Sequence, residues 1–419
     1  MSSFDYQLSK HLVFRDAEAC RKARSVRRED ITRHPNPNFK IRVIENEQAF
    51  GFAWVTSIVS GIKRALDEGR DRYVIILPAP SPAYAMVAHM INELNIPCHH
   101  VHTFNMDEYA NDEGVTAPAD WKGGFQYWMR RDLFGRIKPE LSMPDSHINF
   151  PSTSNVNDYS KMIEDLGGAD VCYGGVGWCG HIAFFEPYLG IGYEDRIDEY
   201  LELGSRMVDL SMITICQNSL YADGFGAGDW SWGPSKAATI GPRDLKNSKL
   251  VSFWDGYGCG DSYWQKFISR LAAHGPVTPL VPASILQILR SELVLSGPIP
   301  TPRSPPGRNA PCHPERSPRR GRSRRISCLP SCFFRAPEIL RLRGCAPALR
   351  MTGDAWRRES DAGGRRKPGR GTAIARTTRL VILSGTPEGR GVEGSLACRI
   401  ACSERQRSFG SGAAHRRSG

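Results

Sequence analysis

Two short polar clusters hold the side chains of this sequence that could do acid–base chemistry. Residues 103–109 read TFNMDEY and contain adjacent carboxylic acids at Asp107 and Glu108. Residues 174–187 read GGVGWCGHIAFFEP and contain a lone His181. A carboxylate can take a proton from carbon or water, and a histidine that titrates near neutrality can move a proton on oxygen. The two clusters together predict proton-transfer catalysis if the fold brings them to one site.

A parallel sheet would bring them together, because each cluster follows a predicted buried strand. Short apolar segments closed by turn residues, such as 98–104 and 169–173, are typical of buried strands. Strands separated by helices imply right-handed crossovers, and ligands bind beyond the carboxyl ends of such strands. The other expected strands are 41–44, 73–77, 237–240, 250–253 and 292–295, and the expected helices are 17–28, 47–68, 82–94, 124–134, 158–166 and 262–273.

This alternation predicts an α/β fold with a Rossmann-like, open, mostly parallel sheet and helices on both faces. We expect an N-terminal arm over residues 1–40, the α/β domain over 41–300, and a tail over 301–419. The tail is rich in Arg, Pro, Gly and Ser, with one strand-like island at 380–383. Such a composition buries too little apolar area to offset the entropy lost on ordering, so we expect the tail to be disordered.

Charge divides the chain at the same point. Residues 1–300 hold 29 basic and 36 acidic side chains, a balance of −7, whereas residues 301–419 hold 26 basic and 8 acidic ones, a balance of +18. The net charge of +11 therefore comes from the tail. Nucleic-acid binding would have to rest on this tail, which shows neither zinc-ribbon cysteine spacing nor interleaved aromatic residues, and we do not expect it.

The remaining composition favours a cytoplasmic protein with reduced cysteines. The first residues lack a signal-peptide core, and no segment has about 18 uninterrupted apolar residues, so no membrane association is expected. One strand face would carry Cys98, His100 and His102, which could suggest a metal site. We instead interpret the segment as a strand of the sheet, next to the expected ligand-binding edge.

From the residues alone, two interpretations of the site stay open. His181 could be a hydrogen-bonded core histidine, and Asp107 with Glu108 could be an acidic pair at a helix N-terminus. In the catalytic interpretation, Glu186 would fix the tautomer of the His181 imidazole. The glycines would let backbone N–H groups approach anionic oxygens.

The motifs TFNMDEY and GGVG..GHIAF.EP, in this order, resemble those of the glucosamine-6-phosphate deaminase/isomerase family, which shares its fold with the 6-phosphogluconolactonases. Weaker similarity extends over about residues 40–295 and includes PSKAATIGP at 234–242. The resemblance implies ring opening of an amino sugar, isomerisation from aldose to ketose, and loss of ammonia, with no cofactor and no metal. It implies a sugar or sugar phosphate as the partner molecule and allows a homo-oligomer.

The resemblance also assigns the site residues. Asp107 would be the base that shuttles the proton between C1 and C2, His181 would open the ring, and Glu186 would support His181. The substrate-binding residues implied are Gly175, Gly177, Gly180, Ser81 and Lys266.

Four departures from the family pattern affect the expected substrate. Cys179 replaces an aspartate two residues before the histidine, and Phe185 replaces an asparagine. The phosphate loop at 77–82 reads LPAPSP, in which each proline removes a backbone N–H, and Leu220 stands where a phosphate-binding arginine is expected. We therefore expect phosphate binding to differ from the family pattern. A lactone hydrolase of the 6-phosphogluconolactonase type and a catalytically weak sugar-binding regulator are the alternatives.

Overall fold

The centre of the fold is a seven-stranded sheet in which every neighbouring pair of strands is parallel. The computed structural model describes residues 7–220, 228–257 and 263–300. The strand order is β1-β10-β9-β6-β2-β3-β5. Its members are β1 (Phe39–Ile44), β2 (Tyr73–Leu77), β3 (Val101–Asn105), β5 (Ile148–Asn149), β6 (Val171–Gly174), β9 (Val251–Asp255) and β10 (Ser291–Ser296). The expected α/β class with a mostly parallel sheet is confirmed.

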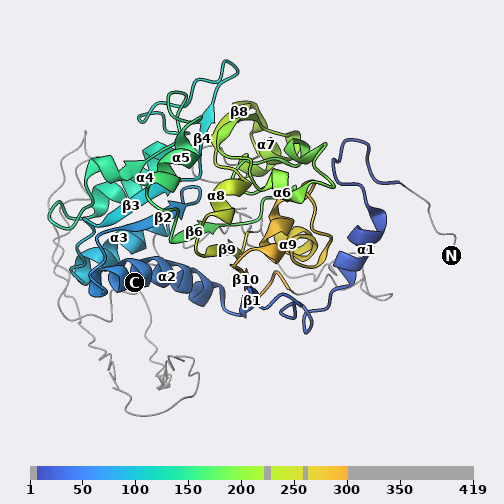
Figure 1. Cartoon of the computed structure of the whole chain (residues 1–419), viewed down its shortest axis with the longest axis horizontal. Coiled ribbons are helices and arrows are strands. Elements are labelled where there is room, and N and C mark those ends of the chain that lie inside the picture. Colours follow the sequence, from blue (N-terminus) through green and yellow to red (C-terminus); the bar gives the residue numbers. More distant parts are fainter. Residues whose placement is uncertain (1–6, 221–227, 258–262, 301–419) are drawn as a thin grey trace, which may run out of the picture. The chain divides into compact units, whose positions relative to one another are not determined.

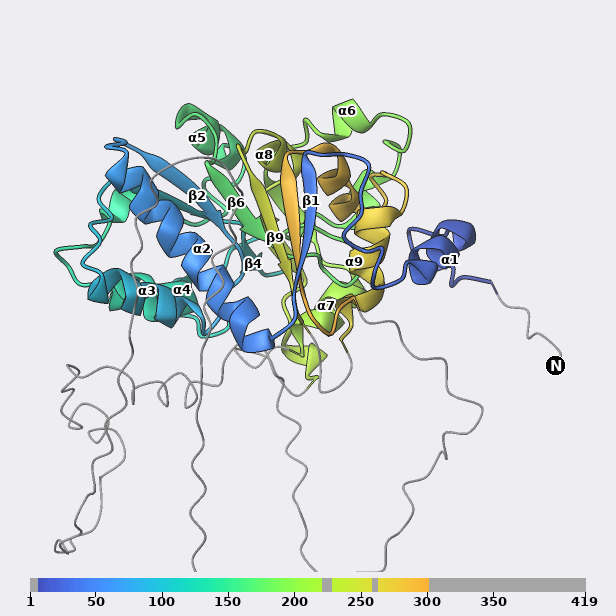
Figure 2. The ribbon, with the colours of Figure 1, turned by 90° about the horizontal axis from the view of Figure 1, so that it is seen from below.

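Helices cover both faces of this sheet (Figures 1 and 2). Along β2, Tyr73, Ile75 and Leu77 pack into one hydrophobic cluster with α2, α3 and α4, whereas Val74 and Ile76 pack into a second cluster with α5, α8 and α9. All five side chains of β2 are buried, as expected for a strand between two helical layers. The helices are α1 (Ala17–Ser25), α2 (Glu47–Asp67), α3 (Tyr84–Glu93), α4 (Phe125–Asp132), α5 (Tyr159–Asp165), α6 (Ile197–Tyr200), α7 (Met212–Asn218), α8 (Pro242–Lys246) and α9 (Gln265–His274).

A second, antiparallel sheet of three strands was not foreseen. It has the order β4-β8-β7, with β4 (Asp107–Ala110), β8 (Lys236–Thr239) and β7 (Arg206–Asp209). Residues 237–240, expected as a strand, lie largely in β8. The chain therefore passes directly from β3 of the large sheet into β4 of the small one, and Asp107 is the first residue of that second strand.

The segment before β1 contributes to the same core. Ala23 of α1 and Ile31 are fully buried in the cluster that contains α9. The Arg270 guanidinium of α9 donates to the carbonyls of Val26, Ile299 and Pro300, at 3.1, 3.1 and 2.5 Å respectively. Arg270 is buried, so one cation ties the end of α1 to the residues that follow β10.

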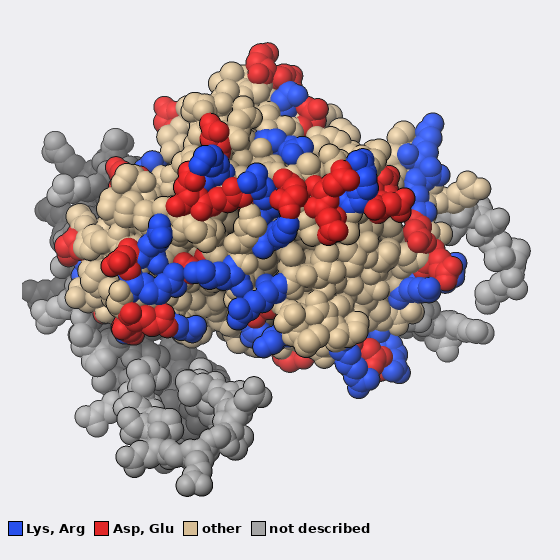
Figure 3. Space-filling model, in the orientation of Figure 1, with Lys and Arg blue, Asp and Glu red and all other residues tan. Residues whose placement is uncertain are grey.

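On the face shown in Figure 3, basic and acidic side chains are intermingled. In residues 7–220, 228–257 and 263–300, none of the helices has both the length and the apolar character needed to cross a bilayer. The expectations for the tail at 301–419, including the island at 380–383, lie outside the described residues.

Candidate active site

The glycine-rich loop after β6 is held in place by a buried carboxylate at the end of β9. Asp255 is fully buried, and its Oδ1 accepts from the Val176 N–H at 2.9 Å. Its Oδ2 accepts from the Ser269 hydroxyl at 2.5 Å, and Gln265 donates both to Asp255 and to the Val176 carbonyl. Burial raises the pKa of Asp255 to about 7. The loop that leads to His181 is therefore fixed at its start by β9 and α9.

His181 is buried, and its Nδ1 faces two neutral partners. Thr214 Oγ1 of α7 lies 3.0 Å from Nδ1, and Cys179 Sγ lies 3.1 Å from it. Glu186 reaches the imidazole through the cysteine, because its Oε2 accepts from Cys179 Sγ at 3.3 Å while its Oε1 accepts from the Ser211 N–H at 3.0 Å. Glu186 is thus connected to His181 through Cys179 Sγ.

The charges of these three groups follow from burial. Burial, together with the charge of Glu186, raises the pKa of Cys179 well above its usual value, so the thiol stays protonated. Burial also lowers the pKa of His181, against the opposing effect of Glu186. At neutral pH the imidazole is therefore neutral, and one of its two nitrogens is free to accept a proton.

Gly177 makes room for that imidazole. A Cβ added at Gly177 would lie 1.9 Å from His181 Nε2, so Gly177→Ala must push the ring out of its position. We expect any activity that uses His181 to fall by about 10²-fold, the usual result of a displacement of about 1 Å in a catalytic group. Steady-state kinetics with circular dichroism as a folding check would measure this.

Gly233→Ala is the matched control for this prediction. Its added methyl group would meet only Ile215 at 3.3 Å and the Trp230 carbonyl at 3.5 Å. A Gly177→Ala variant as active as Gly233→Ala would contradict the packing of the imidazole against residue 177.

Asp107 is buried at the start of β4, with one oxygen left without a partner. Its Oδ1 has no hydrogen bond among the described residues, and neither polar atom of the neighbouring Asn105 amide has one. Burial, and then the charge of Glu108, raises the pKa of Asp107 well above its usual value. Buried polar groups are normally satisfied, so these atoms are the expected contacts of a bound polar molecule.

Glu108 has a different role from its neighbour. Its carboxylate accepts from the N–H groups of Tyr109 and Phe125 at 2.9 Å and of Gln126 at 2.6 Å. Two of these N–H groups open α4, where a carboxylate satisfies the unpaired donors of the first turn. The acidic-pair interpretation thus fits Glu108, which caps a helix, but not Asp107.

Short contacts through β8 connect the segments that carry Asp107 and His181. Asp107 is paired with Thr239 in the ladder between β4 and β8, and the Thr239 hydroxyl accepts from the Phe184 N–H at 3.0 Å. The Phe184 ring lies 6.1 Å from the His181 ring and 5.5 Å from the Tyr109 ring. These contacts connect the segment that carries His181 to the small sheet that contains Asp107.

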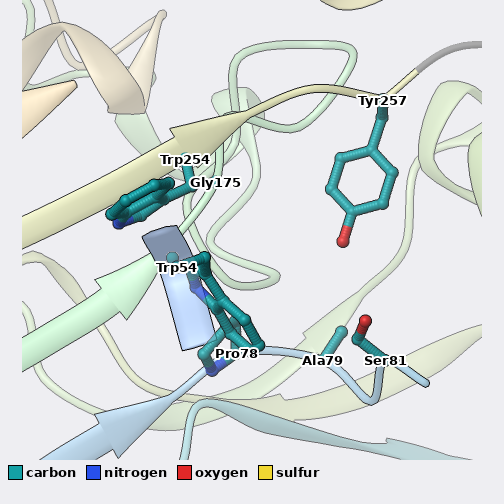
Figure 4. A pocket seen from close by; sticks show the side chains of 8 residues that line it. Trp54, Pro78, Ala79, Ser81, Gly175, Trp254 and Tyr257 are labelled. Atoms are coloured by element: carbon teal, nitrogen blue, oxygen red, sulfur yellow. The ribbon is translucent and has the colours of Figure 1, made fainter. Parts of the chain in front are cut away.

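A pocket opens at the carboxyl ends of β2, β6 and β9 (Figure 4). This is where the connections from the sheet leave in opposite directions, and ligands bind at such points in open α/β sheets. Gly175 and Ser81, two of the predicted substrate-binding residues, line it. Its other lining residues are Trp54, Pro78, Ala79, Gly174, Trp254 and Tyr257.

The other three predicted substrate-binding residues, Gly177, Gly180 and Lys266, do not line the pocket, and Gly177 packs against the His181 ring instead. Gly180 adopts φ +93°, a conformation that favours glycine, and a Cβ there would lie 3.0 Å from Val281 and 3.2 Å from Ile268, so this residue serves the turn and its packing. The Lys266 Nζ lies 5.7 Å from the centre of the Tyr263 ring, and Lys266 is not among the residues that line the pocket.

Cys98, His100 and His102 are not brought together. The Cys98 thiol donates to the Ile96 carbonyl, the His100 ring lies 3.3 Å from the Ile62 carbonyl, and the His102 ring stacks on His147. They form no three-residue metal cluster within the described part of the chain.

Sequence reasoning missed the groups that position the site. Thr214 follows His181 by 33 residues, and nothing in its local pattern marks it. Asp255 offered a signal, because it is an acidic residue at the carboxyl end of an expected strand and is followed by glycine. The aromatic lining of the pocket comes from two distant segments, Trp54 of α2 and Trp254 with Tyr257 at the end of β9, and no local pattern links them.

Comparison with known proteins gives glucosamine-6-phosphate deaminases among the sequence relatives, although no protein-family profile matches the chain. The chain is 28% identical over 215 residues to a glucosamine-6-phosphate deaminase of Lachnoclostridium phytofermentans, covering 50% of this chain and 79% of that protein. It is 28% identical over 222 residues to the deaminase of Drosophila pseudoobscura pseudoobscura (51% and 72% covered) and 26% identical over 245 residues to that of Porphyromonas gingivalis (57% and 83% covered).

The fold is also shared with a solved structure. A structure described as a monomeric glucosamine-6-phosphate deaminase aligns with a TM-score of 0.51 at 19% identity, covering 63% of this chain and all of that one. The resemblance first seen in two motifs is thus confirmed by similarity that spans about half of the sequence.

Proposed function

We propose that this chain is an amino-sugar isomerase and deaminase of the glucosamine-6-phosphate type. The observation that carries the proposal is a buried carboxyl group at the start of β4, Asp107, one oxygen of which has no hydrogen-bond partner among the described residues, in a chain with deaminases among its sequence relatives. Removing a proton from carbon requires such a base, whereas hydrolysis of a lactone does not.

The proposed reaction begins with ring opening by His181. Because the imidazole is neutral, one nitrogen can accept the anomeric hydroxyl proton and pass it to the ring oxygen as the bond between C1 and that oxygen breaks, which gives the open-chain aldose. Asp107 then takes the proton from C2 and returns it to C1, while a proton of the amine moves to the C1 oxygen and leaves a ketimine at C2. Water hydrolyses the resulting ketimine to a ketose and ammonia.

Cys179, Thr214 and Glu186 are proposed as positioning residues. With Nδ1 turned toward Sγ and Oγ1, a proton on Nδ1 leaves Nε2 as the accepting nitrogen. Glu186 holds Cys179 by accepting a hydrogen bond from its thiol. A neutral thiol supports the imidazolium less than a carboxylate would, so His181 is a weaker base here than in the family pattern.

The pocket, whose lining includes neither Asp107 nor His181, is proposed to hold part of the sugar against aromatic faces. Its aromatic lining residues are Trp54, Trp254 and Tyr257. The loop that follows β2 contributes Pro78 and Ala79 to the lining instead of a row of backbone N–H donors. Whether the preferred substrate carries a phosphate is part of the test: glucosamine 6-phosphate and glucosamine should be compared directly.

The proposal predicts that kcat/KM falls on the acid side of its pH profile at a higher pH than an ordinary carboxyl group would give. Asp107 works only when ionised, and burial raises its pKa, so the activity is lost as pH falls through a value above the usual carboxyl range of about 4. His181 does not contribute to this loss near neutrality, because its pKa is lowered. Initial rates between about pH 4.5 and 9, with the fold monitored at each pH, test this; activity that stays constant down to pH 4.5 contradicts it.

The deciding experiment measures ammonia and ketose together from the purified full chain. Equal yields of the two products from an amino sugar support the proposal. Turnover of a phosphorylated gluconolactone without ammonia release would favour the lactonase alternative, and ligand-induced thermal stabilisation without product would favour a regulatory binder.

Three further expectations stay predictions: a cytoplasmic location, self-association, and no nucleic-acid binding by the tail. The division into residues 1–40, 41–300 and 301–419 is likewise proposed. Size-exclusion chromatography, cell fractionation and a DNA-shift assay at two salt concentrations address them separately.

A further inference from the structure

Cys179, His181 and Glu186 present three different metal-binding atoms to one another. Sγ lies 3.1 Å from His181 Nδ1 and 3.3 Å from Glu186 Oε2, and one ligand atom from each residue lies within 4.8 Å of the other two. Within the described part of the chain, this is the one group of three His, Cys or acidic residues so arranged. The geometry points to a site for a zinc-like divalent ion, and we propose that the ion inhibits the enzyme.

Two of the three separations, those from Sγ, fit a tetrahedral ion with few changes, whereas the ligand atoms of His181 and Glu186, which lie within 4.8 Å of each other, must come into the same range. Bonds of about 2.0–2.3 Å from zinc to nitrogen, oxygen and sulfur place neighbouring ligand atoms about 3.3–3.7 Å apart. The two separations from Sγ need to grow by only a few tenths of an ångström. Three protein ligands leave a fourth position, and the Thr214 hydroxyl lies close to it, 3.0 Å from Nδ1 and 3.7 Å from Sγ.

The charges also fit a buried ion. Binding displaces the Cys179 thiol proton to solvent, so that a thiolate and a carboxylate balance the two positive charges of the ion. A neutral complex removes most of the cost of burying a charge. His181 and Glu186 are buried, and Cys179 is partly exposed, so the ion would enter past the cysteine.

The donor set determines which ions bind. Thiolate and imidazole ligands favour zinc and cobalt(II), whereas Mg²⁺ and Ca²⁺ require oxygen donors. The replacement of a carboxylic acid by Cys179 therefore shifts the site toward zinc. We expect Zn²⁺ and Co²⁺ to bind, and Mg²⁺ and Ca²⁺ not to compete at a hundredfold excess.

Binding at Nδ1 explains the inhibition, which rests on the proposed function. A neutral imidazole that binds an ion through Nδ1 carries its proton on Nε2. Nε2 is then a donor and can no longer accept the anomeric proton. The metal thus holds His181 in the tautomer that cannot open the ring.

Direct binding is tested on the reduced, metal-stripped full chain. Co²⁺ should give a thiolate charge-transfer band, and titration against a chromophoric chelator counts the bound Zn²⁺. Because the chain has other cysteines, the comparison with variants isolates the site: Cys179→Ala and Glu186→Gln should each weaken one equivalent of Zn²⁺ at least tenfold. Cys216→Ala, which removes a partly exposed cysteine of α7 outside the cluster, should keep that equivalent.

The outcomes separate this inference from the proposed function. Unchanged Zn²⁺ stoichiometry and cobalt spectra in folded Cys179→Ala and Glu186→Gln would overturn the metal site. If the site binds, one equivalent of Zn²⁺ should lower ammonia release at least tenfold, and a chelator should restore it, in the wild-type chain and in Cys216→Ala alike. Tight binding with undiminished turnover would overturn the inhibition, whereas binding to a chain that releases no ammonia from any amino sugar would support the site and defeat the proposed function.

Discussion

Replacing Asp107 by asparagine is expected to lower kcat for ammonia release by about 10³-fold, within the range that general acid–base catalysis contributes. The amide has nearly the shape of the carboxyl group but cannot take a proton from C2. Since Asp107 Oδ1 has no partner among the described residues, the fold should lose little stability. Incorporation of solvent deuterium at C1 should fall together with ammonia release.

Asp112→Asn is the matched control, because Asp112 is an exposed acid five residues further along the chain. Its kcat should stay within twofold of wild type. Full activity in a folded Asp107→Asn protein would remove Asp107 from the mechanism and leave the proposed reaction without its base.

His181→Gln is expected to lower kcat by about 10²-fold or more, because glutamine can donate a hydrogen bond but cannot move a proton. The effect should be on kcat more than on KM, since ring opening follows binding. Steady-state kinetics on the amino sugar measure both constants, and the thermal unfolding midpoint shows whether the buried site still packs.

His102→Gln serves as the comparison, because that ring stacks on His147, with centroids 3.6 Å apart. It should retain wild-type kinetics. Equal losses in His181→Gln and His102→Gln would indicate a general structural effect and would count against ring opening by His181.

The large sheet was predictable because its strands are apolar, short and separated by helices of sufficient length. The start of β3 was set too early, since residues 98–100 precede the strand and turn toward it. The small sheet was missed for a physical reason: β4 has four residues and pairs with a strand more than 120 residues further on, so its stability comes from long-range pairing.

In the candidate site, too, local sequence patterns were predictable and long-range contacts were not. Asp107 and His181 could be singled out because each lies in a polar cluster that follows an expected strand, but the partners of His181 could not. In the sequence, Cys179 stands only where the family pattern has an aspartate, whereas in the structure its sulfur lies between the imidazole and Glu186. Such contacts depend on the path of α7 over the loop, which local sequence does not encode.

The guanidinium of Arg270 couples the two extremities of the folded region. It is bonded at once to Val26, near the beginning, and to Ile299 and Pro300. Cleavage before residue 299 would leave the buried guanidinium with N–H donors that have lost their acceptors. Each such donor costs about 1–3 kcal/mol of stability, and the packing of α1 would weaken as well. A protease that cuts after Pro300 would leave all three hydrogen bonds intact. Removal of residues 299 and 300 would break two of them and weaken the attachment of both ends of the folded region.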